Sequence, residues 1–195
     1  KKTGEPLKGK RILINAGPTR EPIDPVRYIS NHSSGKMGIA LADMAAAYGA
    51  EVDLVLGPVN IKPSSATVNV TNVTTAESMA EACISLFPKC NIAILSAAVA
   101  DFTPVTSAKK KIKKNDSSLT ITLKETVDIA GHLGKMKKRS QLLAGFALET
   151  DNELKNAVAK LRKKNLDIIV LNSLRDKGAG FGIDTNRITI IDRDN

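Results

Sequence analysis

Short apolar runs alternate with segments of helical periodicity, and this alternation constrains the fold more than any other feature of the chain. The helical segments lie at 35–48, 75–87, 128–133 and 152–164. Runs that predict β-strands lie at Arg11–Ala16, Glu51–Leu56, 67–70, 91–97, 119–123, 142–147, 168–171 and 187–191. Strands that alternate with helices are typical of a parallel sheet covered on both faces. We therefore expect an α/β fold: a three-layer, doubly wound, mostly parallel sheet of Rossmann-like type, ending in an antiparallel strand.

The composition predicts one domain with an aliphatic core. The 195 residues are 42% hydrophobic but only 3% aromatic, and tryptophan is absent. A chain of this size can bury a core without disulfides. We predict a single domain at 11–195, preceded by a basic linker at 1–10. The sequence stops at a turn-like stretch just after the last predicted strand, so we expect the domain to continue beyond Asn195.

Positive charge is concentrated in three clusters, at 109–114, 135–139 and 160–164, within a formal net charge of +9. Such clusters favour polyanionic ligands, either a nucleic acid or a phosphorylated small molecule, and the alternative for each cluster is solvated surface. A nucleic-acid-binding module is disfavoured because stacking aromatic residues are scarce and no nucleic-acid motif is present.

Nothing in the sequence points to export or to a membrane. No stretch resembles a signal peptide or a membrane span. The two cysteines, Cys83 and Cys90, lack metal-ligand spacing, and we interpret them as packing residues in a reducing compartment. We expect a cytoplasmic protein with no membrane partner.

The loop at 17–38 carries the most specific chemistry. It reads GPTREPIDPVRYISNHSSGKMG and joins the first predicted strand to the first predicted helix. The residues suited to a phosphate or substrate are Gly17, Thr19, Ser33, Ser34 and Gly35. Small and hydroxyl residues let backbone N–H groups approach an anion, and the helix N-terminus adds a favourable dipole. The loop is thus predicted to hold a phosphate-bearing ligand at the carboxyl edge of the sheet.

This loop matches neither standard phosphate-binding motif. The glycine fingerprint GxGxxG is missing after the first strand, and Met37 occupies the hydroxyl position of the P-loop pattern. Both absences weigh against a nicotinamide-dependent reductase and an ordinary nucleoside triphosphatase. No catalytic triad is available, because His32 and His132 lie in different segments. Charge neutralisation and positioning, as in nucleotidyl transfer, fit the residues better.

Further candidate residues follow the later strands, and each has a plainer alternative. Asp101 could reach a ribose or a phosphate-bound cation, or could simply cap the strand end. Lys111 suits a triphosphate as a point charge, or belongs to a solvated lysine run. Phe146 could stack on a base or pack in the core. Lys160 and Lys164 share one helix face and could hold one anion or face solvent.

These motifs, in this order, resemble the phosphopantothenoylcysteine synthetase family over essentially the whole chain. In bacteria this domain is usually the C-terminal half of a bifunctional protein of coenzyme A biosynthesis. The resemblance implies a ligase that joins 4′-phosphopantothenate to L-cysteine through an acyl-cytidylate. It would use CTP with Mg²⁺ and release CMP and pyrophosphate. It further implies a homodimer, with FMN bound only in a fused decarboxylase half.

The resemblance also assigns roles to residues. Asn31, with Arg27 beside it, would act on the acyl-cytidylate, and Lys111 would be needed to form it. Asp101 would lie near the nucleotide and its cation. The other residues matching nucleotide contacts of the family are Leu95, Ser96, Ala97, Val127, Asp128, Ile129, Ala130, Phe146, Lys160 and Lys164. The chain departs from the family pattern at Val127, where a proline is usual, and at Leu148, where an alanine is usual.

Overall fold

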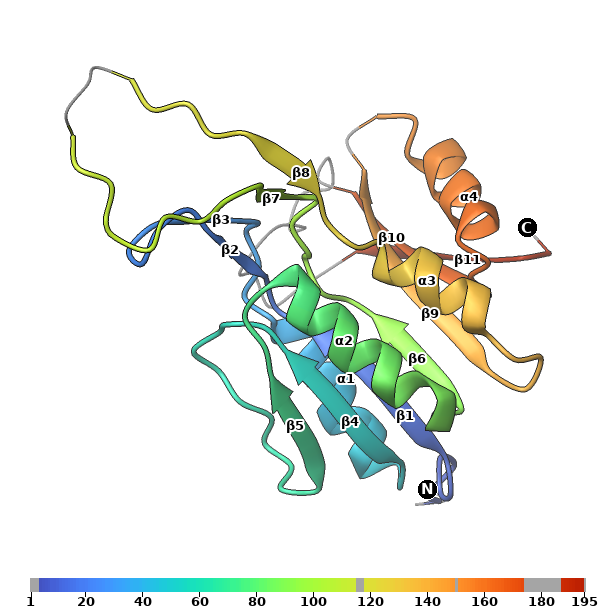
Figure 1. Ribbon diagram of the computed structural model, residues 1–195. Helices are drawn as coiled ribbons and strands as arrows, with labels where there is room; N and C mark the ends of the chain where they lie inside the picture. The colour runs from blue at the N-terminus through green and yellow to red at the C-terminus, as the bar shows by residue number, and fades with distance from the viewer. Residues whose placement is uncertain (1–3, 115–117, 150, 174–186, 195) are drawn as a thin grey trace.

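A seven-stranded sheet forms the centre of the protein. The computed structural model describes residues 4–114, 118–149, 151–173 and 187–194. The strands follow the order β11-β10-β9-β6-β1-β4-β5 (Figure 1), and β11 is antiparallel to β10 while the other neighbouring pairs are parallel. Their bounds are β1 Arg11–Ala16, β4 Glu51–Leu56, β5 Val68–Asn72, β6 Ile92–Leu95, β9 Leu142–Glu149, β10 Ile168–Ser173 and β11 Ile188–Asp192.

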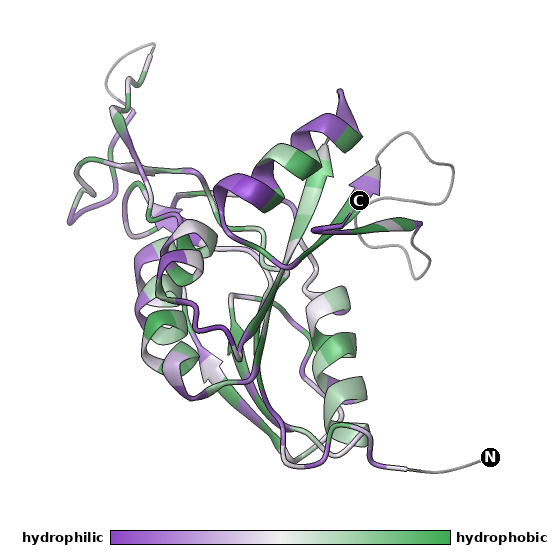
Figure 2. Cartoon of the chain, turned by 90° about the vertical axis from the view of Figure 1, so that its right-hand side faces the viewer, coloured by the Kyte–Doolittle hydropathy of each residue, from purple (hydrophilic) through white to green (hydrophobic). Residues whose placement is uncertain are grey.

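Helices cover both faces of this sheet. They are α1 Lys36–Ala47, α2 Ala76–Leu86, α3 Ile129–Met136 and α4 Glu153–Lys163, and a 3₁₀ turn at Phe87–Lys89 follows α2. Successive strand residues point to opposite faces. Leu13 belongs to the core cluster that contains Met79 of α2, Leu133 of α3 and Leu161 of α4, whereas Ile12 and Ile14 belong to the cluster beneath α1. Figure 2 shows the apolar strands between these helix layers. The expected three-layer, doubly wound α/β fold is confirmed.

The start of α2 illustrates how local sequence sets the helix boundaries. The Thr75 hydroxyl accepts a hydrogen bond from the Ser78 N–H at 3.2 Å, and the Ser78 hydroxyl accepts one from the Thr75 N–H at 3.0 Å. This reciprocal capping box satisfies backbone donors that a helix N-terminus otherwise leaves unpaired. The prediction that Thr75 caps this helix is confirmed.

The strand order reverses between β1 and β6. From β1 the chain continues to β4 and β5 on one side of the sheet, and then returns to β6, β9 and β10 on the other. At such a switch point the two connections leave in opposite directions and open a crevice beyond the carboxyl ends of the strands. The loop after β1 and the segment after β6 both border this crevice.

Two short antiparallel pairs stand outside the main sheet, and three of their four strands do not follow from the sequence pattern. The strands β2 Arg20–Pro22 and β3 Tyr28–Ser30 form a hairpin, and β7 Phe102–Pro104 pairs with β8 Leu123–Glu125. The strand predicted at 119–123 is wrong, because only Leu123 belongs to β8. The alternating side chains before it have no sheet face to cover, and the side chains of Leu119 and Leu123 are exposed.

Three glycines form the corner between β1 and α1. Gly17 and Gly35 both have positive φ, 79° and 74°, which favours glycine. At Gly38 an added Cβ would lie 2.4 Å from the Ala16 Cβ, so α1 packs directly on the end of β1. A tight turn, a close backbone approach and helix–strand contact are the roles of the three glycines in GxGxxG. The three glycines therefore meet at one corner, although the β2–β3 hairpin separates Gly17 from the other two along the chain.

Candidate functional site

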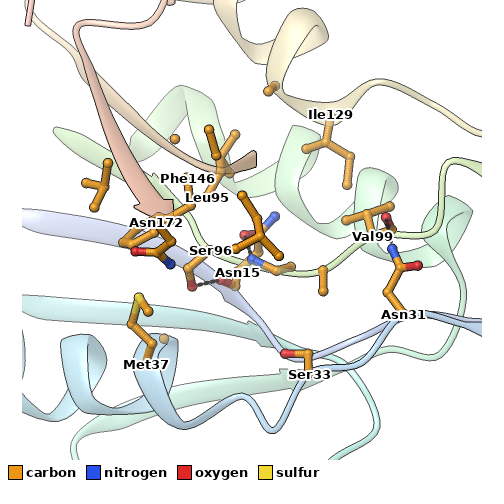
Figure 3. Close-up of a pocket in the computed structure, with 18 of the residues that line it drawn as sticks. Asn15, Asn31, Ser33, Met37, Leu95, Ser96, Val99, Ile129, Phe146 and Asn172 are labelled. Carbon is orange, nitrogen blue, oxygen red and sulfur yellow. Dashed lines mark hydrogen bonds between the residues drawn. The ribbon is translucent and has the colours of Figure 1, made fainter. Parts of the chain in front are cut away.

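A cavity of about 1440 Å³ opens at the carboxyl edge of the sheet, over the crevice between β1 and β6 (Figure 3). This volume exceeds the roughly 300–1,000 Å³ of a typical small-molecule site, so it can take more than one small substrate. The predicted site residues that line it are Asn31, Ser33, Ser34, Gly35, Leu95, Ser96, Ala97, Asp101, Val127, Asp128, Ile129, Ala130, Phe146, Lys160 and Lys164.

The segment at 96–101 forms the floor of this cavity and is held by hydrogen bonds to other segments. Ala98 donates its N–H to the Gly17 carbonyl at 2.9 Å, and Ala100 donates its N–H to the Thr19 hydroxyl at 3.0 Å. The Thr126 hydroxyl donates to the Ala100 carbonyl at 2.6 Å. A segment held at so many points is preorganised, which lowers the entropy cost of ligand binding.

Asn31 lies at the cavity rim, just beyond β3. Its side-chain amide Nδ2 donates a hydrogen bond to the Val99 carbonyl at 2.9 Å (Figure 3). This bond orients the amide group while the residue itself stays exposed. A neutral amide here can hold a polar group of a ligand without adding charge to the site.

The start of α1 forms one side of the cavity. Gly35 is the N-cap residue, and Ser33 and Ser34 precede it with their hydroxyls 3.3 Å and 3.4 Å from the N–H groups of Gly35 and Lys36. Backbone donors at a helix N-terminus favour anions.

The start of α3 and the face of α4 form the opposite side. Asp128 caps α3 through the Gly131 N–H at 3.0 Å, and the Lys164 ammonium lies 3.0 Å from the same carboxylate. Burial acts to raise the pKa of Asp128, but these two contacts outweigh it and the pKa is lowered. Phe146 and Lys160 complete this part of the lining.

Four predicted site residues lie outside the cavity lining. Gly17 and Thr19 support it from below through the bonds to Ala98 and Ala100. Arg27 and Lys111 lie on an arm made of the β2–β3 hairpin and the segment at 105–114, which projects from the body of the protein (Figure 1).

A buried carboxylate holds the two parts of this arm together. Asp24 accepts hydrogen bonds from the Arg27 guanidinium and from the Ile112 N–H at 3.0 Å, and Arg27 also donates to the Ile112 carbonyl at 2.8 Å. The Arg27 guanidinium, helped by the Ile112 N–H, holds the pKa of Asp24 well below its usual range. Lys111, next to Ile112, is thereby fixed relative to Arg27.

The described residues contain neither a cluster of metal-ligating side chains nor an activated thiol. Within the described ranges, no group of three or more His, Cys, Asp or Glu residues could hold a metal ion. Burial raises the pKa of Cys83 to about 12 and that of Cys90 to about 11, so both thiols are poor nucleophiles at neutral pH. None of the helices in the described part of the chain is long and apolar enough to cross a membrane.

Several lining residues are not among those predicted from the sequence. Asn15 is the last but one residue of β1 and lies beneath the floor, while Asn172, Ile188 and Ile190 come from β10 and β11. The polar Asn15 within the apolar run of β1 is the one sequence feature that could have indicated its place at the cavity, because a buried polar residue in a strand is unusual. The residues of β10 and β11 gave no such indication, because their approach to the cavity depends on the tertiary fold.

Residues 7–195 match the family described as the C-terminal domain of DNA/pantothenate metabolism flavoproteins. The chain belongs to this family. Relatives include a protein named cysteine/cysteine sulfinic acid decarboxylase from an unknown prokaryotic organism, 65% identical over 99% of this chain and 54% of that protein. The coenzyme A biosynthesis bifunctional protein CoaBC of Bacillus subtilis (strain 168) is 49% identical over 98% of this chain and 47% of that protein. The chain thus spans about half the length of these curated relatives.

Solved structures agree with this assignment. The C-terminal domain of a coenzyme A biosynthesis bifunctional protein CoaBC superposes with a TM-score of 0.82 at 44% identity, covering 98% of this chain and 85% of that one. The DNA/pantothenate metabolism flavoprotein from Streptococcus pneumoniae also has a TM-score of 0.82, at 26% identity, covering 96% and 90%. The family resemblance drawn from the motifs is confirmed.

Proposed function

We propose that this domain joins 4′-phosphopantothenate to L-cysteine, using CTP and Mg²⁺ and releasing CMP and pyrophosphate, within coenzyme A biosynthesis. The observation that carries the proposal is the cavity itself. It gathers fifteen of the predicted site residues from separate motifs at one sheet edge. Its relatives named as coenzyme A biosynthesis proteins supply the metabolic context.

The reaction has two steps in this proposal. A carboxylate oxygen of phosphopantothenate attacks the α-phosphorus of CTP, the bond to the β-phosphate breaks, and pyrophosphate leaves. The cysteine amine then attacks the acyl carbon of the acyl-cytidylate, loses a proton, and displaces CMP as the amide forms. Both reactants of the first step are anionic, so cationic side chains must offset their repulsion.

The residues divide this work according to their positions. The Ser96–Ala97 backbone and Phe146 hold the base, and Lys160 and Lys164 approach the phosphates. Lys111 neutralises charge in the first step, and Asn31 holds the acyl carbonyl in the second without adding a competing charge. The exposed carboxylate of Asp101 would suit a Mg²⁺ ion bound with the triphosphate, because hard divalent ions prefer oxygen ligands, and such an ion would offset the charge of the phosphates.

The positions of Arg27 and Lys111 favour a homodimer with shared sites. Both residues lie on the projecting arm and not in the cavity lining of their own chain. The arm also exposes the apolar side chains of Val26, Tyr28 and Val105, and those of Phe102, Leu119 and Leu123 are exposed in and just before the adjoining β7–β8 pair. Exposed apolar clusters of this kind mark protein interfaces. We place the arm of one chain at the cavity of a second copy, and an FMN-binding decarboxylase in the other half of the full protein.

Pyrophosphate release tests the proposed reaction. The protein is incubated with each nucleoside triphosphate in turn, with and without phosphopantothenate and cysteine. We expect pyrophosphate only when CTP and phosphopantothenate are both present, and an amide product only when cysteine is added. Pyrophosphate release that needs no phosphopantothenate would contradict the proposal.

Complementation tests the shared site. Asn31→Asp and Lys111→Gln each inactivate amide formation, and the two variants are co-refolded in equal amounts. If each site takes Asn31 from one chain and Lys111 from the other, half of the dimers contain one site with neither substitution, so about a quarter of the wild-type activity returns. If both residues serve one site from one chain, every site carries a lesion and no activity returns.

A further inference from the structure

Asn15 controls the backbone donors at the floor of the cavity. The residue is 2% exposed, and its side chain points from β1 toward the end of β6 (Figure 3). The main-chain carbonyl oxygen of Asn15 accepts hydrogen bonds from the Ser96 N–H at 3.2 Å and from the Ser96 hydroxyl at 2.6 Å. Its side-chain Oδ1 accepts the Ala97 N–H at 3.0 Å. One residue therefore engages every hydrogen-bond donor of Ser96 and Ala97.

The acceptors of the same two residues are left available. Within the described part of the chain, the carbonyl oxygens of Ser96 and Ala97 accept no hydrogen bond, and both residues line the cavity. The floor thus offers acceptors and withholds donors at this point. A base edge with an exocyclic amino group can donate to such a floor, whereas a base edge with a carbonyl at that position meets a second acceptor.

The side chain of Asn15 is itself firmly placed. It lies against the Cys83 thiol in the core beneath α2, and no buried side-chain polar atom of the described residues lacks a partner. Its orientation is set on both sides, by the thiol below and the Ala97 N–H above. Asn15 contacts the ligand-binding backbone and acts on the ligand through it.

We propose that Asn15 is a specificity-determining positioning residue, which selects an amino-bearing pyrimidine over its carbonyl analogue by withdrawing the Ala97 N–H from the cavity. This inference rests on the proposed nucleotide-dependent ligase function. Without the Asn15 acceptor, in either a smaller or an isosteric apolar variant, the Ser96–Ala97 peptide loses this restraint and can turn its N–H toward a carbonyl oxygen of the base. The penalty against UTP should then fall, while CTP loses part of its fixed acceptor geometry.

The test compares CTP and UTP on the same protein preparations. The ratio of their kcat/KM values is measured by pyrophosphate release for wild type, Asn15→Ala and Asn15→Leu, the last of which keeps the side-chain volume in the core. We expect the CTP-to-UTP ratio to fall about tenfold in both variants, as one hydrogen bond is lost and another gained. Asn15→Asp, which keeps the Oδ1 acceptor, should retain the wild-type ratio. The ratio does not depend on the folded fraction, so partial folding does not hide the result.

Gln141→Ala is the matched control. Gln141 is also buried and bonds to backbone carbonyls, those of Phe87 and Cys90 at 2.8 Å and 2.9 Å, but it lies at the opposite edge of the sheet. The Gln141→Ala variant should have a lower melting temperature but an unchanged CTP-to-UTP ratio of kcat/KM. An unchanged ratio in Asn15→Ala and Asn15→Leu, or an equal change in Gln141→Ala, overturns the inference. A wild-type protein that releases no pyrophosphate with any nucleotide overturns the proposed function instead.

Discussion

Gly38→Ala tests whether the contact between α1 and β1 is as close as the structure has it. The added Cβ would lie 2.4 Å from the Ala16 Cβ and 2.5 Å from the Ser96 Oγ. Carbon atoms in optimal contact are about 3.5–4.0 Å apart, so the helix or the strand end must move by roughly 1 Å. Overpacking of this kind costs about 1–3 kcal/mol, and the better helix propensity of alanine returns at most about 1 kcal/mol. We expect a net loss of about 1–2 kcal/mol.

This loss should lower the melting temperature by about 2–8 °C in a domain of this size, measured by calorimetry. Because Ser96 lines the cavity and α1 carries the Ser33–Lys36 corner, kcat/KM for CTP should fall by up to about a hundredfold, as expected for a misplacement near 1 Å. Gly4→Ala is the control, since nothing lies within 4 Å of its added Cβ. A Gly38→Ala variant with wild-type melting temperature and activity would refute this account of the corner.

Four further outcomes follow from the site. Asn31→Asp should still release pyrophosphate but stall before amide formation, and a normal yield of amide product would contradict this role. Lys111→Gln should suppress CTP-dependent pyrophosphate release by about a hundredfold or more, as for loss of one stabilising group at a developing charge; unchanged release would count against it. Phe146→Ala should raise the KM for CTP about tenfold through lost base stacking, with the KM for cysteine unchanged. The pKa of Asp24 is lowered in the folded state, so its stabilisation is fully present above the ordinary aspartate pKa of about 3.9 and is lost progressively as the pH falls from there through the lowered pKa. Asp24→Asn should therefore lower the melting temperature more at pH 6 than at pH 3, where part of the stabilisation is already lost, and equal losses at both values would contradict the role of Asp24 in joining the hairpin to the segment at 105–114.

Much of the main sheet could be predicted because it is locally encoded. The apolar runs of β1 and β4 gave their bounds directly, and the end of α1 was marked by Gly49. The β2–β3 hairpin could not be found in this way. Its strands contain Pro22 and few apolar residues, and they are held by contacts with distant segments, such as the bond from the Arg20 N–H to the Thr74 carbonyl.

The candidate site shows the same division between local and distant information. Residues next to strand ends, such as Ser96 and Phe146, could be assigned to the cavity because parallel strands bring their carboxyl ends to one edge. Arg27 could not be placed, because its position depends on an ion pair with Asp24 and on the distant Ile112. Spacing alone also hid the glycine corner, since an inserted hairpin separates residues that meet in space.

The contacts of Asp24 and Arg27 with Ile112 determine how the segment at 105–114, which carries Lys111, can move. Both the N–H and the carbonyl of Ile112 are bonded to the Asp24–Arg27 pair, and Ala108 is bonded to Ile23. Hairpin and segment therefore move as one body, and Lys111 travels only when the hairpin travels with it. The long, flexible side chain of Lys111 therefore extends from a backbone whose position the hairpin fixes.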